Sequence, residues 1–161
     1  MKKLLTVLLV VGSMVVPSSV HAQDYQKGVQ AIIANDYPTA MKEFFPLAEA
    51  GDVRAQYSLG AMFGDILDVN RDYKKALVWI LKAAEQGHPA AQQRLGLMYE
   101  YGEGVIQDKV YAHMWYNIGA SNGSTSGSKW RDEITLKMSA ADISKAQELA
   151  RECVKKQYKA C

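Results

Sequence analysis

The sequence predicts an all-α protein in which antiparallel helix pairs stack into a solenoid, with capping helices at the C-terminal end. Three observations favour this fold. The chain repeats itself with a period of 36 residues, apolar side chains recur with helical spacing inside each repeat unit, and aspartate or glycine stands where the helices are expected to begin or end. Stacked units of this kind bury a continuous core that no single unit buries alone.

The 36-residue repeat appears when residues 51–86 are aligned with residues 87–122. The two segments share 11 identities, whereas unrelated segments of this length share about two. The same shift also aligns residues 36–49 with residues 72–85, which adds half a unit. The identities of the two full units are Gly51/Gly87, Ala55/Ala91, Gln56/Gln92, Leu59/Leu95, Gly60/Gly96, Met62/Met98, Val69/Val105, Asp72/Asp108, Ala76/Ala112, Trp79/Trp115 and Ala84/Ala120.

Each full unit is predicted to contain two helices, with a further helix pair before the repeats and capping helices after them. In the first helix of each unit, apolar residues spaced four apart form one face that is expected to point inward. These residues are Ala55, Leu59 and Phe63, and then Ala91, Leu95 and Tyr99. The expected helices cover residues 24–34, 37–50, 53–64, 73–86, 89–101 and 109–121, and the capping helices lie within residues 126–161.

Aspartate and glycine mark the ends of these helices. An aspartate side chain at the N-cap accepts a hydrogen bond from a free backbone N–H and contributes about 1 kcal/mol. A glycine after the last helical residue adopts the left-handed conformation with least strain. The expected N-caps are Asp36, Asp72 and Asp108, the expected C-terminal glycines are Gly51, Gly87 and Gly123, and Ser139 with Asp142 approximates a capping box for the last helix.

Two further pairs of glycines have different explanations. Gly60 and Gly96 lie inside first helices, where glycine has low propensity, so they predict a close approach of neighbouring helices. Gly102 and Gly104 flank one acid in the link between the two helices of the second unit. A phosphate-binding loop would need a preceding strand and a Gly-Lys-Ser/Thr sequence, which this segment lacks. We therefore interpret this segment as a turn.

Residues 1–22 are predicted to form a signal peptide. Two lysines precede an apolar run over residues 4–16, and Val20 and Ala22 occupy the −3 and −1 positions of a signal-peptidase site. The run is shorter than the roughly 20 residues that span a bilayer, so no stable membrane insertion is expected after cleavage. The mature chain, residues 23–161, has the size of one domain. Its expected location is periplasmic or secreted, in a bacterium.

Removal of the signal peptide leaves a formally neutral chain. The whole sequence holds 19 Lys and Arg against 17 Asp and Glu, and two of the lysines belong to the signal peptide, so 17 basic residues face 17 acidic ones. Proteins that bind nucleic acid or anionic membranes usually carry a basic excess. No nucleic-acid partner is therefore expected.

The two cysteines, Cys153 and Cys161, form a candidate disulfide. An exported protein folds in an oxidising compartment, and the count is even. Eight residues of continuous helix rise about 12 Å, which is too far for a disulfide. Pairing therefore requires the helix to end near Lys156 or Gln157 and the tail to fold back. The alternative is two unpaired thiols on a frayed terminus.

The repeat pattern resembles the Sel-1-like repeat family, which is related to the tetratricopeptide repeats. The segments that carry the resemblance are "AQYSLGAMF" and "AQQRLGLMYEYGEGVIQDKVYAHMWYNIGASNG", and with the opening half-unit they cover residues 24–123. The link "GDILDVNRD" of the first unit departs from the pattern, because it lacks the two glycines of the family. The resemblance implies a right-handed, curved α-solenoid that acts as a scaffold or adaptor, including in the bacterial envelope.

The sequence offers little catalytic chemistry. His88 lies at a turn between repeats and is expected to act as a cap, and His113 aligns with Leu77 and is expected to be packed or exposed. Ser126 and Lys129 satisfy the Ser-x-x-Lys spacing of penicillin-recognising enzymes, but the companion Ser-Asp-Asn and Lys-Thr-Gly motifs are missing. We expect no catalytic residues and no cofactor.

One cluster resembles the beginning of a calcium-binding loop. Asp68, Asn70 and Asp72 occupy the first three ligand positions, but Tyr73 and Trp79 stand where the glycine and the bidentate glutamate belong. Zinc ligands with suitable spacing are also missing from the sequence. We therefore expect no metal site, and Asp72 is adequately explained as an N-cap.

The first helices of the units are expected to form a concave binding surface. With the apolar face inward, the candidate partner-binding residues are Tyr57, Arg94, Leu97 and Tyr101, because tyrosine and arginine are frequent interface residues. The alternative is that both tyrosines only cover neighbouring helices. The leading hypothesis is an exported, non-catalytic module that binds a protein or peptide. The competing hypotheses are a β-lactam-directed or cell-wall enzyme that uses Ser126 and Lys129, and a receptor for a small ligand or glycan.

Overall fold

The computed structural model describes residues 18–66 and 71–161 of the chain. Within these ranges the protein is all-helical and contains no strand, as predicted. The elements are α1 (Ser18–Ile33), α2 (Tyr37–Glu49), α3 (Val53–Ala61), the π-helix η1 (Met62–Ile66), α4 (Tyr73–Ala84), α5 (Pro89–Tyr101), α6 (Lys109–Ser121), α7 (Gly127–Thr135) and α8 (Ala140–Lys155).

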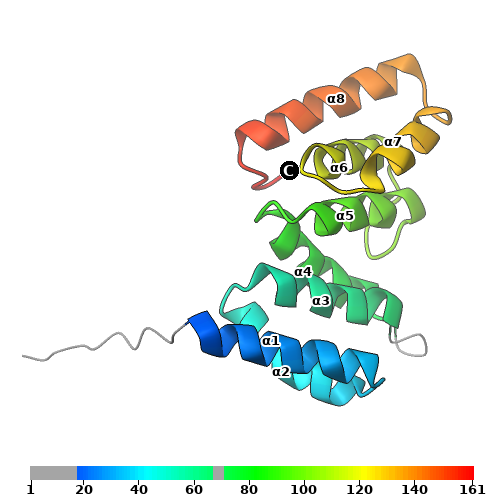
Figure 1. Cartoon of the computed structure of the whole chain (residues 1–161). Coiled ribbons are helices and arrows are strands. Elements are labelled where there is room, and N and C mark those ends of the chain that lie inside the picture. The colour runs from blue at the N-terminus through cyan, green and yellow to red at the C-terminus, as the bar shows by residue number, and fades with distance from the viewer. Residues whose placement is uncertain (1–17, 67–70) are drawn as a thin grey trace, which may run out of the picture.

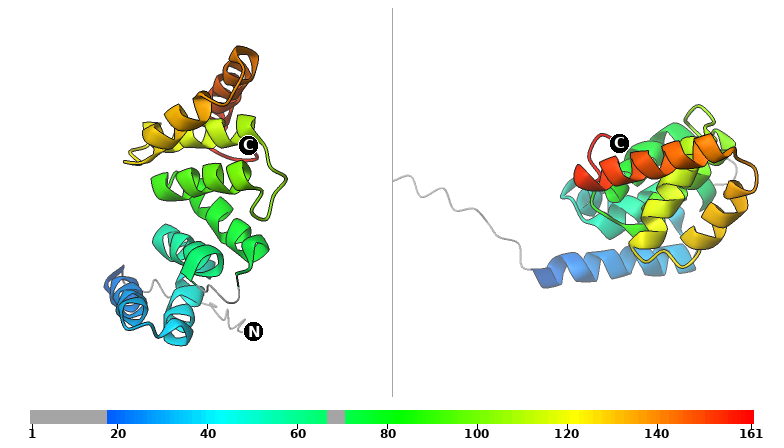
Figure 2. Two further views of the ribbon diagram at one scale, coloured as in Figure 1. Left: turned by 90° about the vertical axis from the view of Figure 1, so that its right-hand side faces the viewer. Right: turned by 90° about the horizontal axis from the view of Figure 1, so that it is seen from above.

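The helices stack as consecutive antiparallel pairs along one direction. Figure 1 shows α1 and α2 at one end of the stack and α8 at the other end. The pairs are α1 with α2, α3 with α4, and α5 with α6, and each second helix also packs against the first helix of the next pair. Both α7 and α8 pack on α6, and the view from above in Figure 2 shows α8 lying across the end of the stack. The predicted solenoid with C-terminal capping helices is confirmed.

The predicted caps form in the structure. The side chain of Asp36 accepts a hydrogen bond from Thr39 N, that of Asp72 from Lys75 N, and that of Asp108 from Val110 N and Tyr111 N. Ser139 Oγ accepts from Asp142 N, which is one of the two hydrogen bonds of a capping box. The Asp142 carboxylate accepts from the Ser139 hydroxyl rather than from its backbone N–H, so the predicted capping box forms in part. Gly51, Gly87 and Gly123 have φ values of +97°, +82° and +100°, in the left-handed region.

The core contains the apolar face that the helical spacing predicted. Leu59 and Leu95 are fully buried, and so is Trp115. Gly60 lies where an added Cβ would clash with the side chain of Ile80, and Gly96 where it would clash with the ring of Tyr116. The two glycines therefore allow the first helix of each unit to approach its second helix closely, as predicted.

The first full unit differs from the prediction at the end of its first helix. The expected helix over residues 53–64 ends as an α-helix at Ala61 and continues as the π-helix η1. In the second unit, Gly102 ends α5 in the left-handed conformation with φ +74°. The equivalent residue of the first unit is Ile66, and a β-branched residue strongly disfavours that conformation. The wider turn of the π-helix ends the first helix in a different geometry.

Both links nevertheless return to equivalent positions. Asp72 N donates to Phe63 O at 2.9 Å, and Asp108 N donates to Tyr99 O at the same distance. These donors are 36 residues apart, and so are the acceptors. The second helix of each unit therefore begins at the same place relative to the first helix, although the two links differ in sequence.

The C-terminal tail folds back and is cross-linked to the last helix. Helix α8 ends at Lys155, and a disulfide joins Cys153 to Cys161 with a Cα–Cα distance of 5.3 Å. Tyr158 N donates to Cys153 O, and Gln157, Tyr158 and Ala160 have positive φ values that reverse the chain.

The N-terminal end of the chain includes part of the predicted signal peptide. Residues 1–17 lie outside the described residues, and α1 begins at Ser18 and runs past Ala22, the residue before the predicted cleavage site. Among the helices that the structure describes, none is both long enough and apolar enough to cross a membrane.

Candidate interaction face

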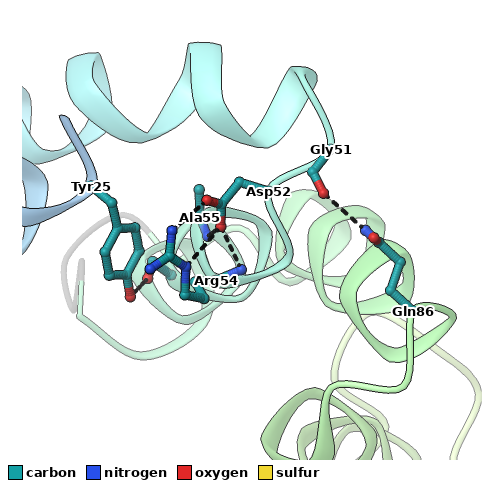
Figure 3. A network of polar contacts seen from close by, with 7 residues as sticks. Tyr25, Gly51, Asp52, Arg54, Ala55 and Gln86 are labelled. Atoms are coloured by element: carbon teal, nitrogen blue, oxygen red, sulfur yellow. Dashed lines mark hydrogen bonds and ion pairs between the residues drawn. The ribbon is translucent and has the colours of Figure 1, made fainter. Parts of the chain in front are cut away.

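The first helices α1, α3 and α5 are connected by a row of side chains, which begins between α1 and α3 (Figure 3). The guanidinium of Arg54 lies 4.4 Å from the ring centroid of Tyr25, and its Nη2 lies 2.7 Å from Asp52 Oδ2. Tyr25 Oη lies 3.3 Å from Ser58 Oγ. Asp52 therefore caps α3 and also holds Arg54 against the ring contributed by α1.

The row continues from α3 to α5 through Tyr57 and His88. Their rings stack with centroids 4.7 Å apart and an interplanar angle of 21°. His88 is the N-cap of α5, because its Nδ1 accepts a hydrogen bond from Ala91 N at 3.2 Å. Burial raises the pKa of the Tyr57 phenol and lowers the pKa of His88, so both groups are held neutral. The expected role of His88 as a cap is found.

Arg94 is held by two carboxylates from different segments. Its Nη2 lies 2.8 Å from Asp65 Oδ1 in η1, and its Nη1 lies 2.7 Å from Glu103 Oε2 in the link after α5. Only 11% of the Arg94 side chain is exposed. The Gly102-Glu103-Gly104 segment is thus a turn whose acid forms an ion pair, and Gly104 fits against the backbone carbonyl of Tyr73.

Leu97 and Tyr101 lie one helical turn apart on α5. Leu97 is half-buried and packs against a small cluster whose buried members are Ala112, Tyr116 and Ile134. Tyr101 is 59% exposed. Of the four predicted partner-binding residues, Tyr101 presents most of its surface to solvent, whereas Tyr57 and Arg94 are occupied by contacts within the protein.

Two buried glutamines, Gln56 and Gln92, also join the units, and they are one of the identities of the repeat. Gln56 Nε2 donates to Ala48 O, and Gln92 Nε2 donates to Ala84 O, both at 3.1 Å. Their Oε1 atoms accept hydrogen bonds from Gln86 Nε2 at 2.7 Å and from Asn122 Nδ2 at 2.8 Å. We call these two arrangements the glutamine clamps. A polar identity at a position between buried apolar residues was the signal for them.

The remaining candidates for chemistry are dispersed. Lys129 lies 3.9 Å from Glu133 and over the ring of Trp130, and Ser126 precedes α7 without a side-chain capping bond. Asp68 and Asn70 of the calcium hypothesis lie outside the described residues, whereas Asp72 caps α4. Among the described residues, no group of three or more His, Cys, Asp or Glu side chains is placed to hold a metal ion.

The chain is similar to known repeat proteins. A family model of the Sel1 repeat matches residues 53–88 and 89–124, two residues later than the units aligned above. The crystal structure of c5321, a protective antigen present in uropathogenic Escherichia coli strains and displaying an SLR fold, has a TM-score of 0.78 and 27% identity. That match covers 86% of this chain but only 31% of c5321.

A second solved structure is similar over most of its own length. The Sel1 repeat protein from Oxalobacter formigenes has a TM-score of 0.61 and 30% identity, and the match covers 70% of this chain and 88% of that protein. Among curated proteins, none matches the chain. The two repeat matches, the stacked helix pairs and the similarity to a solved member show that this chain belongs to the Sel1 repeat family.

Proposed function

We propose that this protein is an exported, non-catalytic adaptor that binds a protein or peptide segment on its first-helix face. We define the first-helix face by residues of α1, α3 and α5, namely Tyr25, Arg54, Tyr57, Arg94, Leu97 and Tyr101. Sel1 repeats generally mediate protein–protein interaction, and proteins built from them are typically non-catalytic scaffolds. These general properties support the proposal.

The observation that carries the proposal is the order imposed on the first-helix face before any partner binds. Arg54 is fixed by Asp52 and Tyr25, and Arg94 is fixed by Asp65 and Glu103. Association normally costs the freedom of such side chains, and side chains that are already ordered reduce this cost. The exposed ring of Tyr101 beside half-buried Leu97 then offers an amphipathic contact of the type enriched at interfaces.

Export is part of the same proposal. The N-terminal segment has the charge, apolar run and small residues of a signal peptide, and the Cys153–Cys161 disulfide is of a kind that persists in oxidising compartments. Cell fractionation and mass measurement of the purified protein test this part. We expect a mature N-terminus at Gln23 in the periplasm or medium, and a full-length protein in the cytoplasm would contradict it.

Site-specific photo-crosslinking tests the binding face. A benzoylphenylalanine at position 101 puts a photoreactive aromatic ketone where the tyrosine ring is exposed, so solvent accommodates its larger size. The matched control carries the same group at position 78, because Val78 is 51% exposed and lies on α4, a second helix. Crosslinking in intact cells, followed by mass spectrometry, identifies adducts from each position.

A protein adduct formed from position 101 and absent from position 78 would support the proposal and identify the partner. Crosslinking is repeated in a Tyr57→Phe background, which keeps the ring stacked on His88 and should keep the fold. If position 78 gives the same adducts as position 101, or gives adducts when position 101 gives none, the first-helix face is not the binding surface.

A further inference from the structure

A polar cavity lies between α6, α7 and α8, on elements other than those of the first-helix face. Its volume is about 410 Å³, within the range typical of small-ligand sites. Its polar lining includes His113 and Asn117 of α6, Arg131 and Asp132 of α7, and Gln147 and Arg151 of α8. Figure 1 shows α7 and α8 lying next to α6 at this end of the stack.

The lining of the cavity carries one positive charge in excess. Arg131 is shared between Asp132 Oδ1, 2.8 Å from its Nη2, and Asn117 Oδ1, to which its Nη1 donates at 3.4 Å. Arg151 is exposed and forms neither an ion pair nor a hydrogen bond with any residue in the described part of the chain. One guanidinium is therefore partly neutralised and the other is available to an anion.

His113 supplies a second, independent sign of a ligand. The residue is 3% exposed, and its Nδ1 has no hydrogen-bond partner among the described residues. Native proteins rarely leave a buried polar atom without a partner, and exceptions often mark functional positions. Burial, and then the charge of Arg131, lower the pKa of His113 against the opposing effect of Asp132, so the ring is neutral and retains one N–H donor.

The polar lining is specific to the last unit. His113 and Asn117 lie one turn apart on α6, and the equivalent residues of α4, 36 positions earlier, are Leu77 and Leu81. The same helix face is thus apolar in the first unit and polar where α7 and α8 form the cavity.

A less polar depression adjoins the cavity. It has a volume of about 330 Å³ and shares Asn117 and Arg151 with the cavity. Ile118, Ala150 and Val154 form its apolar wall, and Ser121 and Lys155 also line it. Val154 is half-exposed there. The two hollows together place a cationic, hydrogen-bonding region beside an apolar one, with Arg151 between them.

We propose that these two hollows bind an organic carboxylate with an apolar substituent, the carboxylate at Arg151 and the substituent against Ile118, Ala150 and Val154. A planar guanidinium matches a carboxylate with two parallel hydrogen bonds. Together the two hollows hold three cations, Arg131, Arg151 and Lys155, against the one carboxylate of Asp132, so they attract an anion. The apolar wall of Ile118, Ala150 and Val154 favours an organic anion over inorganic phosphate. A peptide C-terminus that ends in an apolar residue and a free branched-chain acid present the same chemistry.

Isothermal titration calorimetry with the full mature protein tests the site. The probes are N-acetyl-leucine, its amide, acetate, inorganic phosphate and a five-residue glycine-serine peptide ending in leucine with a free carboxylate. We expect N-acetyl-leucine and the peptide to bind, and the amide, acetate and phosphate to bind at least about tenfold more weakly, which corresponds to the loss of one charge-assisted hydrogen bond or of the apolar contact. Tighter binding of the peptide or of the small acid decides between the two sources.

Arg151→Gln is the test variant, because the side chain has no partner to lose in the described fold. The matched control is Lys145→Gln, an exposed lysine on the same helix that lines neither hollow. Arg151→Gln should weaken N-acetyl-leucine at least about tenfold and Lys145→Gln should not change it, with Arg151→Lys intermediate. Equal binding to the acid and the amide, equal loss in both variants, or no binding of any carboxylate at millimolar concentration would overturn the proposal. These outcomes are independent of crosslinking at position 101.

Discussion

Reduction of the Cys153–Cys161 disulfide should lower the stability of the whole domain, since the cross-linked tail packs against the stack. A cross-link between residues separated by 8 positions restricts the unfolded chain and contributes about 2.5 kcal/mol in the loop-closure estimate. Two local contributions modify this value. Three non-glycine residues, Gln157, Tyr158 and Ala160, adopt left-handed conformations that cost about 1 kcal/mol each.

The contacts of the tail offset that cost. Tyr158 Oη donates to Asn122 Oδ1 at 3.1 Å, its ring lies against Gly87, and it packs on the buried core. One hydrogen bond and one partly buried ring together contribute about 2 to 3 kcal/mol. The local contributions therefore nearly cancel, and the free energy of unfolding should fall by about 2 kcal/mol on reduction. For a domain of this size the melting temperature should fall by about 6 °C.

Circular dichroism melts at 222 nm with and without a phosphine reductant measure the effect. The Cys153→Ala/Cys161→Ala variant is the control, because its melting temperature should match that of the reduced protein and should not respond to reductant. Thiol titration before and after reduction confirms that the bond was present and was opened. Equal melting temperatures of oxidised and reduced protein, in a sample that releases two thiols, would refute the reasoning.

Three further changes test contributions to the stability of the fold. Gln92→Met keeps the side-chain volume but removes both hydrogen bonds of one glutamine clamp, so urea unfolding should show a loss of about 2 kcal/mol, and an unchanged midpoint would contradict the role of the clamp. Gly96→Ala should destabilise by about 2 kcal/mol because its Cβ would clash with Tyr116, despite the better helix propensity of alanine, and a gain in stability would show that the helices are not in close contact. Burial lowers the pKa of His88 and His113 below 6.5, so as the pH falls the unfolded chain binds protons before the folded protein does. The free energy of unfolding should therefore keep its full value above pH 6.5 and decrease below it. Urea midpoints that stay constant from pH 7.5 to 5 would contradict this.

The helices of the second full unit were predictable to the residue because their boundaries are encoded locally. His88 and Pro89 begin α5, Gly102 ends it, and Asp108 begins α6, and each of these residues acts through its own backbone or a cap. The π-helix η1 was not predictable in the same way. The sequence shows that the link of the first unit lacks the two glycines. The repeat period does not predict which geometry ends the helix when they are missing.

The contacts of the first-helix face were predicted less well than the helices. Helical spacing places Arg94 outside the apolar face of α5, yet only 11% of its side chain is exposed. The two acids that bind it, Asp65 and Glu103, come from two different links, and the spacing of one helix contains no information about them. The stack of Tyr57 on His88 also joins neighbouring units. Contacts between units depend on the rotation from one unit to the next, which a repeat period alone does not give.

The cavity beside α6 shows a more general limit of reasoning from repeats. His113 aligns with Leu77 and, within the repeat, has no reason to be polar. Its environment is set by α7 and α8, which follow no 36-residue pattern and therefore have no counterpart from which to infer their placement. The role of a residue that departs from the repeat in the last unit can therefore be inferred only when the positions of the helices after the repeats are known.

The end of the stack explains why the tail is cross-linked to α8. In both clamps a side chain from the end of a second helix, Gln86 or Asn122, donates to a buried glutamine. Asn122 belongs to the last full unit, and its carbonyl oxygen accepts a hydrogen bond from Tyr158, which lies 36 residues further along the chain. The returning tail therefore contributes a polar contact to the last clamp. A tail held only by this contact would fray, because chain ends lose little by opening. The Cys153–Cys161 disulfide restricts this fraying and keeps Tyr158 beside Asn122, so the cross-link and the clamp stabilise the same end of the solenoid.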